Sequence, residues 1–180
     1  IACLGVARPG VQQCHGCILP YRAAWCVGER STALKAIIDG YKFSRMRGCA
    51  EVLSDLLDET IPHLSDITVV AVPTIAPHRR ERGYGHAELL ARKFARRRGL
   101  PYAQPLYRLT NVTQHGATRA QRQKQAAGTF ASRAIDGGRY LLIDDVYTTG
   151  STLTHATTCL LEAGADEVWV AVVSRQPYQR

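Results

Sequence analysis

Apolar residues along the chain form short runs that predict buried strands. Residues 67–73 (ITVVAVP) and 167–173 (EVWVAVV) are rich in β-branched residues and are not clearly polar on either face. Runs of this kind are typical of strands that are covered on both sides in a parallel sheet. Residues 140–144 (YLLID) predict a further strand, and residues 101–109 a short one that precedes a polar stretch.

Between these runs, apolar residues recur at the spacing of amphipathic helices. A first helix is expected through ALKAIID, capped by Ser31 or Thr32 and ended by Gly40. Three more helices are expected at about 44–62, 85–98 and 151–163. Strands that alternate with helices indicate an α/β fold, in which a mainly parallel sheet is flanked by helices.

Residues 1–28 differ from the rest of the chain. They are rich in Cys, Gly and Pro and show no sustained period. A segment this short buries little apolar surface, so a metal or the main domain must hold it together. We therefore expect two units, a small Cys-rich segment at 1–28 and an α/β domain at 31–180.

Cysteines in this first segment suggest a structural zinc site. Cys14 and Cys17 have the spacing of a zinc knuckle, and Cys3 and Cys26 would complete four thiolates. His15 could replace one of the thiolates. The alternative is an incomplete site whose cysteines stay reduced.

Composition and charge narrow the class of protein. Hydrophobic residues make up 46% and charged residues 21%, as in globular proteins. No apolar run approaches the ~20 residues that span a bilayer, and the opening IACLGVARPG does not resemble a signal peptide. The net charge of +8 favours anionic partners such as nucleotides, pyrophosphate or nucleic acid.

The strand at 140–144 runs into a hydroxyl-rich turn, YLLIDDVYTTGSTL, at the start of the last predicted helix. Helix N-termini attract anions, because free N–H groups and the helix dipole point the same way. Gly150 would let the backbone wrap closely around a phosphate, where a β carbon would collide. Thr148, Thr149, Gly150, Ser151 and Thr152 are expected to bind this phosphate, and Val146 is expected to contact the same ligand.

Asp144 and Asp145, at the beginning of that turn, need a different partner because carboxylates repel a phosphate. They can accept hydrogen bonds from a cis-diol, and they can interact with Mg²⁺ on the ligand, directly or through water. A phosphate at one end and a diol at the other describe a ribose 5-phosphate group. The alternative is a capped helix after a strand, with acids that merely end the strand.

The string IDDVYTTGST resembles the signature of the type I phosphoribosyltransferases. The resemblance implies their fold and implies phosphoribosyl pyrophosphate, held with magnesium, as the ligand. It also implies that Asp144 and Asp145 contact the ribose hydroxyls, while Thr148 to Thr152 hold the 5-phosphate.

More of the chain is similar to one subgroup, the ComF (ComF/GntX) family of competence proteins. The similarity includes Tyr41-Lys42-Phe43, Arg82-Gly83-Tyr84, Leu106 to Arg108, and EAGADEV near the end. It implies a cytoplasmic protein of natural transformation, with single-stranded DNA and other competence proteins as partners. One departure is that only the Cys14–Cys17 pair is intact, where many members carry two or three such pairs.

Basic residues supply the other half of the expected site. Pro73, Thr74 and Arg82 are expected to bind the pyrophosphate, because arginine forks suit phosphate oxygens. The alternative is a solvated basic turn. Arg122 lies in the polar stretch, and related enzymes carry a mobile hood in this region that excludes water from the reaction. Lys42 is either a further cation of the site or an ordinary surface lysine.

Two functions remain open from the sequence. In the first, the protein is a phosphoribosyltransferase of unknown acceptor, whose catalytic residues are Asp144, Asp145, Arg82 and Arg122. In the second, it is a non-catalytic module that binds single-stranded DNA through its basic surface. Aromatic residues make up only 7% of the chain, which offers few platforms for base stacking.

Overall fold

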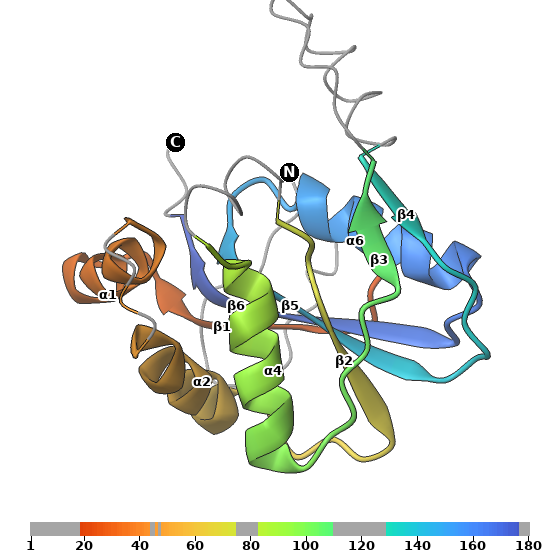
Figure 1. The fold of residues 1–180 in the computed structure, drawn as a ribbon, viewed down its shortest axis with the longest axis horizontal. Coiled ribbons are helices and arrows are strands. Elements are labelled where there is room, and N and C mark those ends of the chain that lie inside the picture. Colours follow the sequence, from red (N-terminus) through yellow and green to blue (C-terminus); the bar gives the residue numbers. More distant parts are fainter. Residues whose placement is uncertain (1–18, 44–45, 47, 75–82, 110–128, 177–180) are drawn as a thin grey trace, which may run out of the picture.

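The computed structural model describes residues 19–43, 46, 48–74, 83–109 and 129–176. Its centre is a four-stranded parallel sheet in the order β1-β6-β5-β2 (Figure 1). The strands are β1 (Ala24–Glu29), β2 (Ile67–Ala71), β5 (Arg139–Tyr147) and β6 (Glu167–Arg175). The expected α/β fold with a mainly parallel sheet is thereby confirmed.

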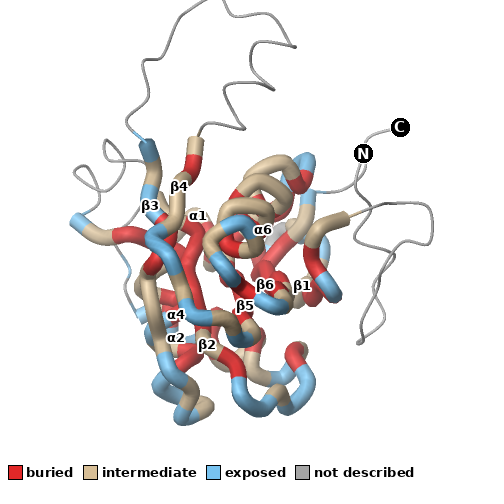
Figure 2. Tube along the Cα trace, turned by 90° about the vertical axis from the view of Figure 1, so that its right-hand side faces the viewer, coloured by how far each residue is buried: buried red, intermediate tan, exposed pale blue. Residues whose placement is uncertain are grey.

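The two central strands form the core of the molecule. Leu141, Leu142 and Ile143 of β5 are fully buried, and so are Val170 and Ala171 of β6. In the register of the two strands, Leu142 pairs with Val170. Figure 2 shows this part of the sheet as buried along its length. The apolar runs thus reflect strands that are covered on both faces.

Helices cover both faces of the sheet. The helices α2 (Cys49–Thr60) and α4 (His86–Arg98) pack side by side on one face, and α6 (Ser151–Glu162) packs on the other. Figure 1 shows α4 in front of the sheet, and the turned view of Figure 2 places α6 on the opposite side. The helix α1 (Thr32–Phe43) packs against α2.

Two predicted helix boundaries were wrong. Gly40 does not end α1, which continues to Phe43. The reason is packing: Tyr41 is fully buried and extends the apolar stripe begun by Leu34 and Ile38. The second helix begins at Cys49 rather than near residue 44.

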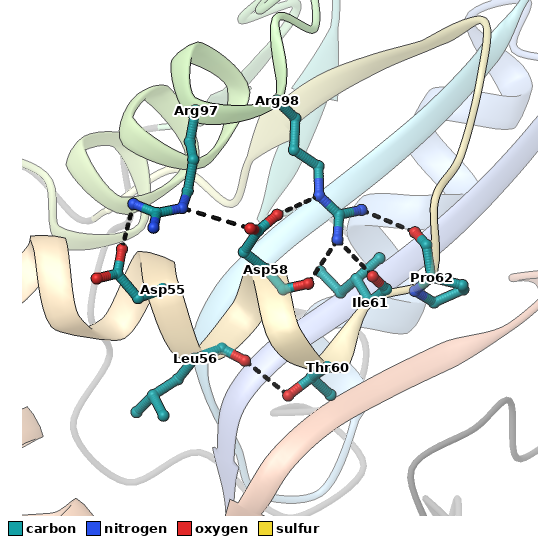
Figure 3. A network of polar contacts seen from close by, with 8 residues as sticks. All are labelled: Asp55, Leu56, Asp58, Thr60, Ile61, Pro62, Arg97 and Arg98. Atoms are coloured by element: carbon teal, nitrogen blue, oxygen red, sulfur yellow. Dashed lines mark hydrogen bonds and ion pairs between the residues drawn. The ribbon is translucent and has the colours of Figure 1, made fainter.

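Arginines at the end of α4 connect it to α2 (Figure 3). Arg97 forms ion pairs with Asp55 and Asp58. Arg98 pairs with Asp58 and donates hydrogen bonds to the carbonyls of Ile61 and Pro62 at the end of α2. These contacts fix the two helices relative to each other on one face of the sheet.

A separate antiparallel pair, β3 (Leu106–Arg108) and β4 (Phe130–Ser132), lies beside the main sheet. The short strand predicted within 101–109 is confirmed as β3. The sequence analysis did not predict β4, because three residues carry too little periodicity to identify a strand. The predicted polar stretch, 110–125, lies outside the described residues.

The first strand corrects one predicted boundary. Residues 24–28, which were assigned to the Cys-rich segment, belong to β1 and pair with β6 in the main sheet. Ala24 and Trp25 are buried there, so tertiary packing rather than a metal accounts for the order of this strand. The remainder of the predicted segment, 1–18, lies outside the described residues. Among the helices that the structure describes, none has the length and apolar character needed to span a bilayer.

Strands β2 and β5 are neighbours, but the helices that follow them lie on opposite faces. The chain passes from β2 to α4 on one face and from β5 to α6 on the other. This arrangement opens a crevice between the carboxyl ends of the two strands, which is where parallel α/β sheets bind their ligands.

Candidate functional site

A hollow of about 220 Å³ lies at this crevice. Val72, Pro73 and Thr74, which follow β2, line one side, and Thr152 from the first turn of α6 also lines it. Its charged and titratable lining residues come from four different elements and are Lys42, His86, Arg108, Asp144 and Asp145. The structure therefore brings together residues that are more than 100 positions apart in the sequence.

The acid pair lies inside β5 rather than after it, because the strand runs to Tyr147. Asp144 pairs in register with Val172 of β6, and both acids line the hollow. The prediction that the acids face a ligand-sized space is consistent with this arrangement. Val146 continues the strand opposite Ser174 and is not part of the lining.

The two carboxyl groups have different surroundings. Asp145 is buried and forms an ion pair with Lys42, with 2.8 Å between Oδ2 and Nζ. Asp144 is half-buried, and its Oδ1 accepts a hydrogen bond from the backbone N–H of Asp145 at 2.8 Å. Burial, together with the charge of Asp145, raises the pKa of Asp144 to about 7.

Lys42 is a residue of the site and not an ordinary surface lysine. It lies in the last turn of α1, and its side chain is only 18% exposed. The neighbouring Tyr41 is fully buried, and its hydroxyl donates to the carbonyl of His86 at 2.7 Å. Tyr84 in turn donates to the carbonyl of Tyr41 at 2.6 Å. The aromatic cluster of Tyr41, Tyr84 and His86 thus fixes the end of α1 against the start of α4.

Arg108 is a site residue to which the sequence analysis gave no role. Its Nε donates to the carbonyl of Pro73 at 2.7 Å, and its guanidinium lies 4.6 Å from the centroid of the Phe130 ring. Burial lowers the pKa of Arg108, and the charge of Asp144 opposes that shift. The only sequence signal was its place in the ComF-like stretch from Leu106 to Arg108.

A second hollow of about 320 Å³ adjoins the first. The two share Val72, Pro73, Thr74 and Arg108 as lining residues. The second hollow also has Arg133 of the segment after β4 in its wall. Pro73 and Thr74, the predicted pyrophosphate-binding residues, therefore line both hollows, as does the guanidinium-bearing Arg108.

The turn before α6 only partly matches its prediction. Thr152 lines the hollow, whereas Thr148 and Thr149 are exposed to solvent and are not among its lining residues. Ser151 is half-buried in the first turn of α6, and its hydroxyl lies 3.2 Å from His155 Nδ1. These positions leave hydroxyl and backbone groups of one helix start next to the acid pair.

Gly150 has a structural role that the sequence did not reveal. It is the N-cap of α6 with φ of 78°, and a β carbon there would overlap with the ring of the buried Tyr147. Its left-handed backbone and the close tyrosine already favour a glycine, and the predicted close approach of a phosphate stays a prediction.

Several expected residues cannot be placed, and one lies elsewhere. Arg82, Arg122, Cys3, Cys14 and Cys17 lie outside the described residues. Cys26 is on β1, at the far edge of the sheet from β2, and its thiol donates to the carbonyl of Gly28 at 3.2 Å. Burial raises the pKa of this thiol. Within the described ranges, no three His, Cys, Asp or Glu side chains are grouped as metal ligands would be, and the zinc site stays a prediction.

Comparison with known sequences agrees with the geometry. Residues 46–180 match the phosphoribosyl transferase domain family. Competence protein ComFC of Bacillus subtilis is 31% identical over 138 residues, which cover 73% of this chain and 55% of that protein. Competence protein F of Haemophilus influenzae is 27% identical, with 91% of this chain and 79% of that protein covered. DNA utilization protein YhgH of Escherichia coli is 28% identical, with coverage of 87% and 73%.

Solved structures share the fold. Glutamine phosphoribosylpyrophosphate amidotransferase of B. subtilis, complexed with ADP and GMP, superimposes with a TM-score of 0.50 at 21% identity over 70% of this chain and 26% of that one. An allosteric regulatory enzyme of purine biosynthesis gives a TM-score of 0.51 at 22% identity, with coverage of 70% and 25%. The resemblances stated from the sequence are confirmed, and the chain belongs to the phosphoribosyl transferase domain family as a member similar to the ComF competence proteins.

Proposed function

We propose that the hollow between β2 and β5 binds the ribose 5-phosphate part of phosphoribosyl pyrophosphate, or of a related nucleotide, together with Mg²⁺. One observation carries the proposal: Asp144, Asp145 and Thr152 of the α6 N-terminus line the same hollow. A carboxyl group suits a diol, and a helix N-terminus suits a phosphate. A ligand with both groups satisfies the two ends of the hollow at once.

The second hollow offers a place for the pyrophosphate. Arg108 faces both hollows and Arg133 lies in the wall of the second, so the two guanidinium groups could neutralise phosphate oxygens. Pro73 and Thr74 connect the two spaces. Arg82 and Arg122 are proposed to add cations from segments outside the described residues.

Magnesium fits the donors that the first hollow contains. Carboxylate oxygens are the protein ligands that Mg²⁺ prefers, and it retains several water molecules in such sites. Both acids line that hollow, so their carboxylates would interact with the ion, directly or through water. When bound with the pyrophosphate, Mg²⁺ would reduce the negative charge next to the acid pair.

In a transfer reaction, the bond between C1 of the ribose and the pyrophosphate breaks while an acceptor bonds to C1. The residues of the hollow would contribute by positioning and electrostatic stabilisation rather than by proton abstraction. A carboxylate of the acid pair would orient the ribose, and the arginines would stabilise the departing pyrophosphate. The acceptor is not defined by the described residues.

Calorimetry with phosphoribosyl pyrophosphate, with and without Mg²⁺, tests the proposal. The intact protein is expected to bind, and the double variant Asp144→Asn plus Asp145→Asn is expected to lose most of the affinity. Asp136→Asn is a matched control, because Asp136 is an exposed acid before β5. Absence of binding by the intact protein would refute the proposal. Release of pyrophosphate with any nucleobase or amine would identify a reaction.

The names of the relatives suggest the cellular role, and we propose that the protein acts in DNA uptake. The alternative of a DNA-binding module finds limited support in the described residues. Arg97 and Arg98, two of the basic residues at the end of α4, are turned to α2, where they pair with acids (Figure 3). A titration with single-stranded DNA at several salt concentrations tests that alternative, because such binding weakens steeply with salt.

We also propose that the N-terminal cysteines bind a structural zinc ion. The support is the Cys14–Cys17 spacing. Metal analysis of the purified chain should find about one zinc per chain, and Cys14→Ser plus Cys17→Ser should remove it. Cys49→Ser is the control, since Cys49 is half-buried at the start of α2 and packs against the core. Zinc-free intact protein would exclude the site.

A further inference from the structure

The two acids of the pair are held differently, and the difference points to separate roles. We propose that Lys42 is a positioning residue. Its ammonium group neutralises Asp145 and holds that carboxylate in an ion pair within the protein, so that Asp144 alone binds the ribose diol. This inference rests on the proposed function, and it assigns different roles to the two acids of the binding motif.

The ion pair between Lys42 and Asp145 is close and shielded from water. Nζ and Oδ2 are 2.8 Å apart, and the two side chains are 18% and 12% exposed. Charged groups at this separation and burial interact much more strongly than a pair on the surface. A ligand hydroxyl that used Asp145 would have to compete with this cation.

Asp144 is held in the opposite way. Its Oδ1 accepts the backbone N–H of Asp145, which fixes the orientation of the carboxyl group. For Oδ2, the described residues provide no hydrogen-bond donor, although the side chain lines the hollow. Asp144 therefore combines a fixed orientation with an oxygen that a ligand can use.

The position of Lys42 is set by its neighbour in α1 and not by the ion pair alone. Tyr41 is fully buried, donates to the carbonyl of His86, and accepts at its own carbonyl from Tyr84. The last turn of α1 is thus fixed to the residues that begin α4. Lys42 reaches the hollow from a rigid support.

Charge balance explains why a phosphate site needs this lysine. Two carboxylates without a cation would repel any phosphate that approached the helix start. Lys42 and Arg108 line the hollow with Asp144 and Asp145, so the four formal charges sum to zero. Removing Lys42 leaves a net negative hollow, and removing Asp145 as well restores the balance.

The test uses ribose 5-phosphate, which lacks pyrophosphate and reports on this hollow alone. Calorimetry would compare the intact protein with Lys42→Met and with the double variant Lys42→Met plus Asp145→Asn. Lys42→Met is expected to weaken binding by roughly tenfold or more, and the added Asp145→Asn should restore most of that loss. Lys35→Met is the control, because Lys35 is an exposed lysine of the same helix. Thermal unfolding of each variant would establish that it is folded.

Each result separates the possibilities. Recovery in the double variant supports the inference, since a lysine that acted only on the stability of α1 would not be rescued by a change at Asp145. A double variant that binds no better than Lys42→Met would overturn it and place either Asp145 or Lys42 in direct contact with the ligand. Unchanged binding by Lys42→Met would overturn it too, with the proposed function intact. If the intact protein does not bind, both ideas fail.

Discussion

Gly150 and Tyr147 are packed so closely that a β carbon on the glycine would lie 2.7 Å from Cζ of the tyrosine. The tyrosine ends β5 and is 5% exposed, and the glycine is the N-cap of α6 with φ of 78°. The conformation of the turn between the acid pair and the start of α6 therefore depends on the ring of Tyr147 and on the absence of a side chain at Gly150.

Gly150→Ala should destabilise the fold by about 2 kcal/mol or more, because a left-handed alanine and an overfilled space both cost free energy. Urea unfolding measures this change. Affinity for ribose 5-phosphate should fall as well, since the turn positions the start of α6.

The control for this variant is Gly48→Ala. Gly48 precedes α2 with φ of −59°, and nothing lies within 4 Å of an added β carbon. Its free energy of unfolding should stay the same or rise by up to about 1 kcal/mol. Equal stability of the two variants would contradict the role assigned to Tyr147.

Arg98→Ala should destabilise the protein by about 2 kcal/mol, because the guanidinium holds Asp58 and several carbonyls at the end of α2. Arg98 is 13% exposed in its side chain, whereas Arg96 is 77% exposed. Arg96→Ala should change the stability by less than about 0.5 kcal/mol. Thermal unfolding of the two variants checks the difference, and an equal effect would count against a structural role for Arg98.

Asp144→Asn should make the stability less dependent on pH. The pKa of Asp144 is raised from 3.8 to about 7 in the folded protein, so between pH 4 and pH 7 the folded state binds a proton that the unfolded chain has released. The free energy of unfolding of the intact protein therefore falls as the pH rises through this window.

The asparagine variant lacks this titration. It should match the intact protein in stability near pH 4 and be the more stable of the two at pH 8, because the intact protein must release this proton while folded. Urea unfolding at several pH values gives the free energy of unfolding of each protein. In the difference between the two, the contributions of groups that titrate in both proteins cancel. A difference that stays constant with pH would disprove a raised pKa for Asp144.

Arg108→Gln should weaken phosphoribosyl pyrophosphate binding by roughly 30-fold or more, since a charged contact to phosphate is lost. Ribose 5-phosphate should lose less affinity than phosphoribosyl pyrophosphate, because it does not extend into the second hollow and is affected only by the loss of one cation from the first. Arg139→Gln is the matched control: Arg139 begins β5 and pairs with Asp66, far along the strand from the acids. Equal losses for the two ligands would argue against a pyrophosphate role for Arg108. Competition calorimetry provides the comparison.

The buried strands and the binding motif could be predicted from the sequence, because each is formed by residues that are neighbours in the chain. The buried strands at 67–73 and 167–173 followed from their apolar runs, and the acid pair and helix start followed from one continuous motif. The strand β1 was not recognised, because its short apolar run continues directly from the Cys-rich segment, and its place in the sheet follows only from its pairing with β6.

The assignments that needed tertiary structure involve residues distant in sequence. Lys42 and Asp145 are 103 positions apart, and no local pattern reveals that they form an ion pair; Arg108 likewise reaches the hollow from a separate hairpin. The sequence by itself determined the α/β class and the sugar-phosphate motif, since strand and helix periods and a turn are properties of adjacent residues. Only the tertiary structure decided which cations meet the two acids, because long-range packing, here the contacts of α1 with the start of α4, sets those distances.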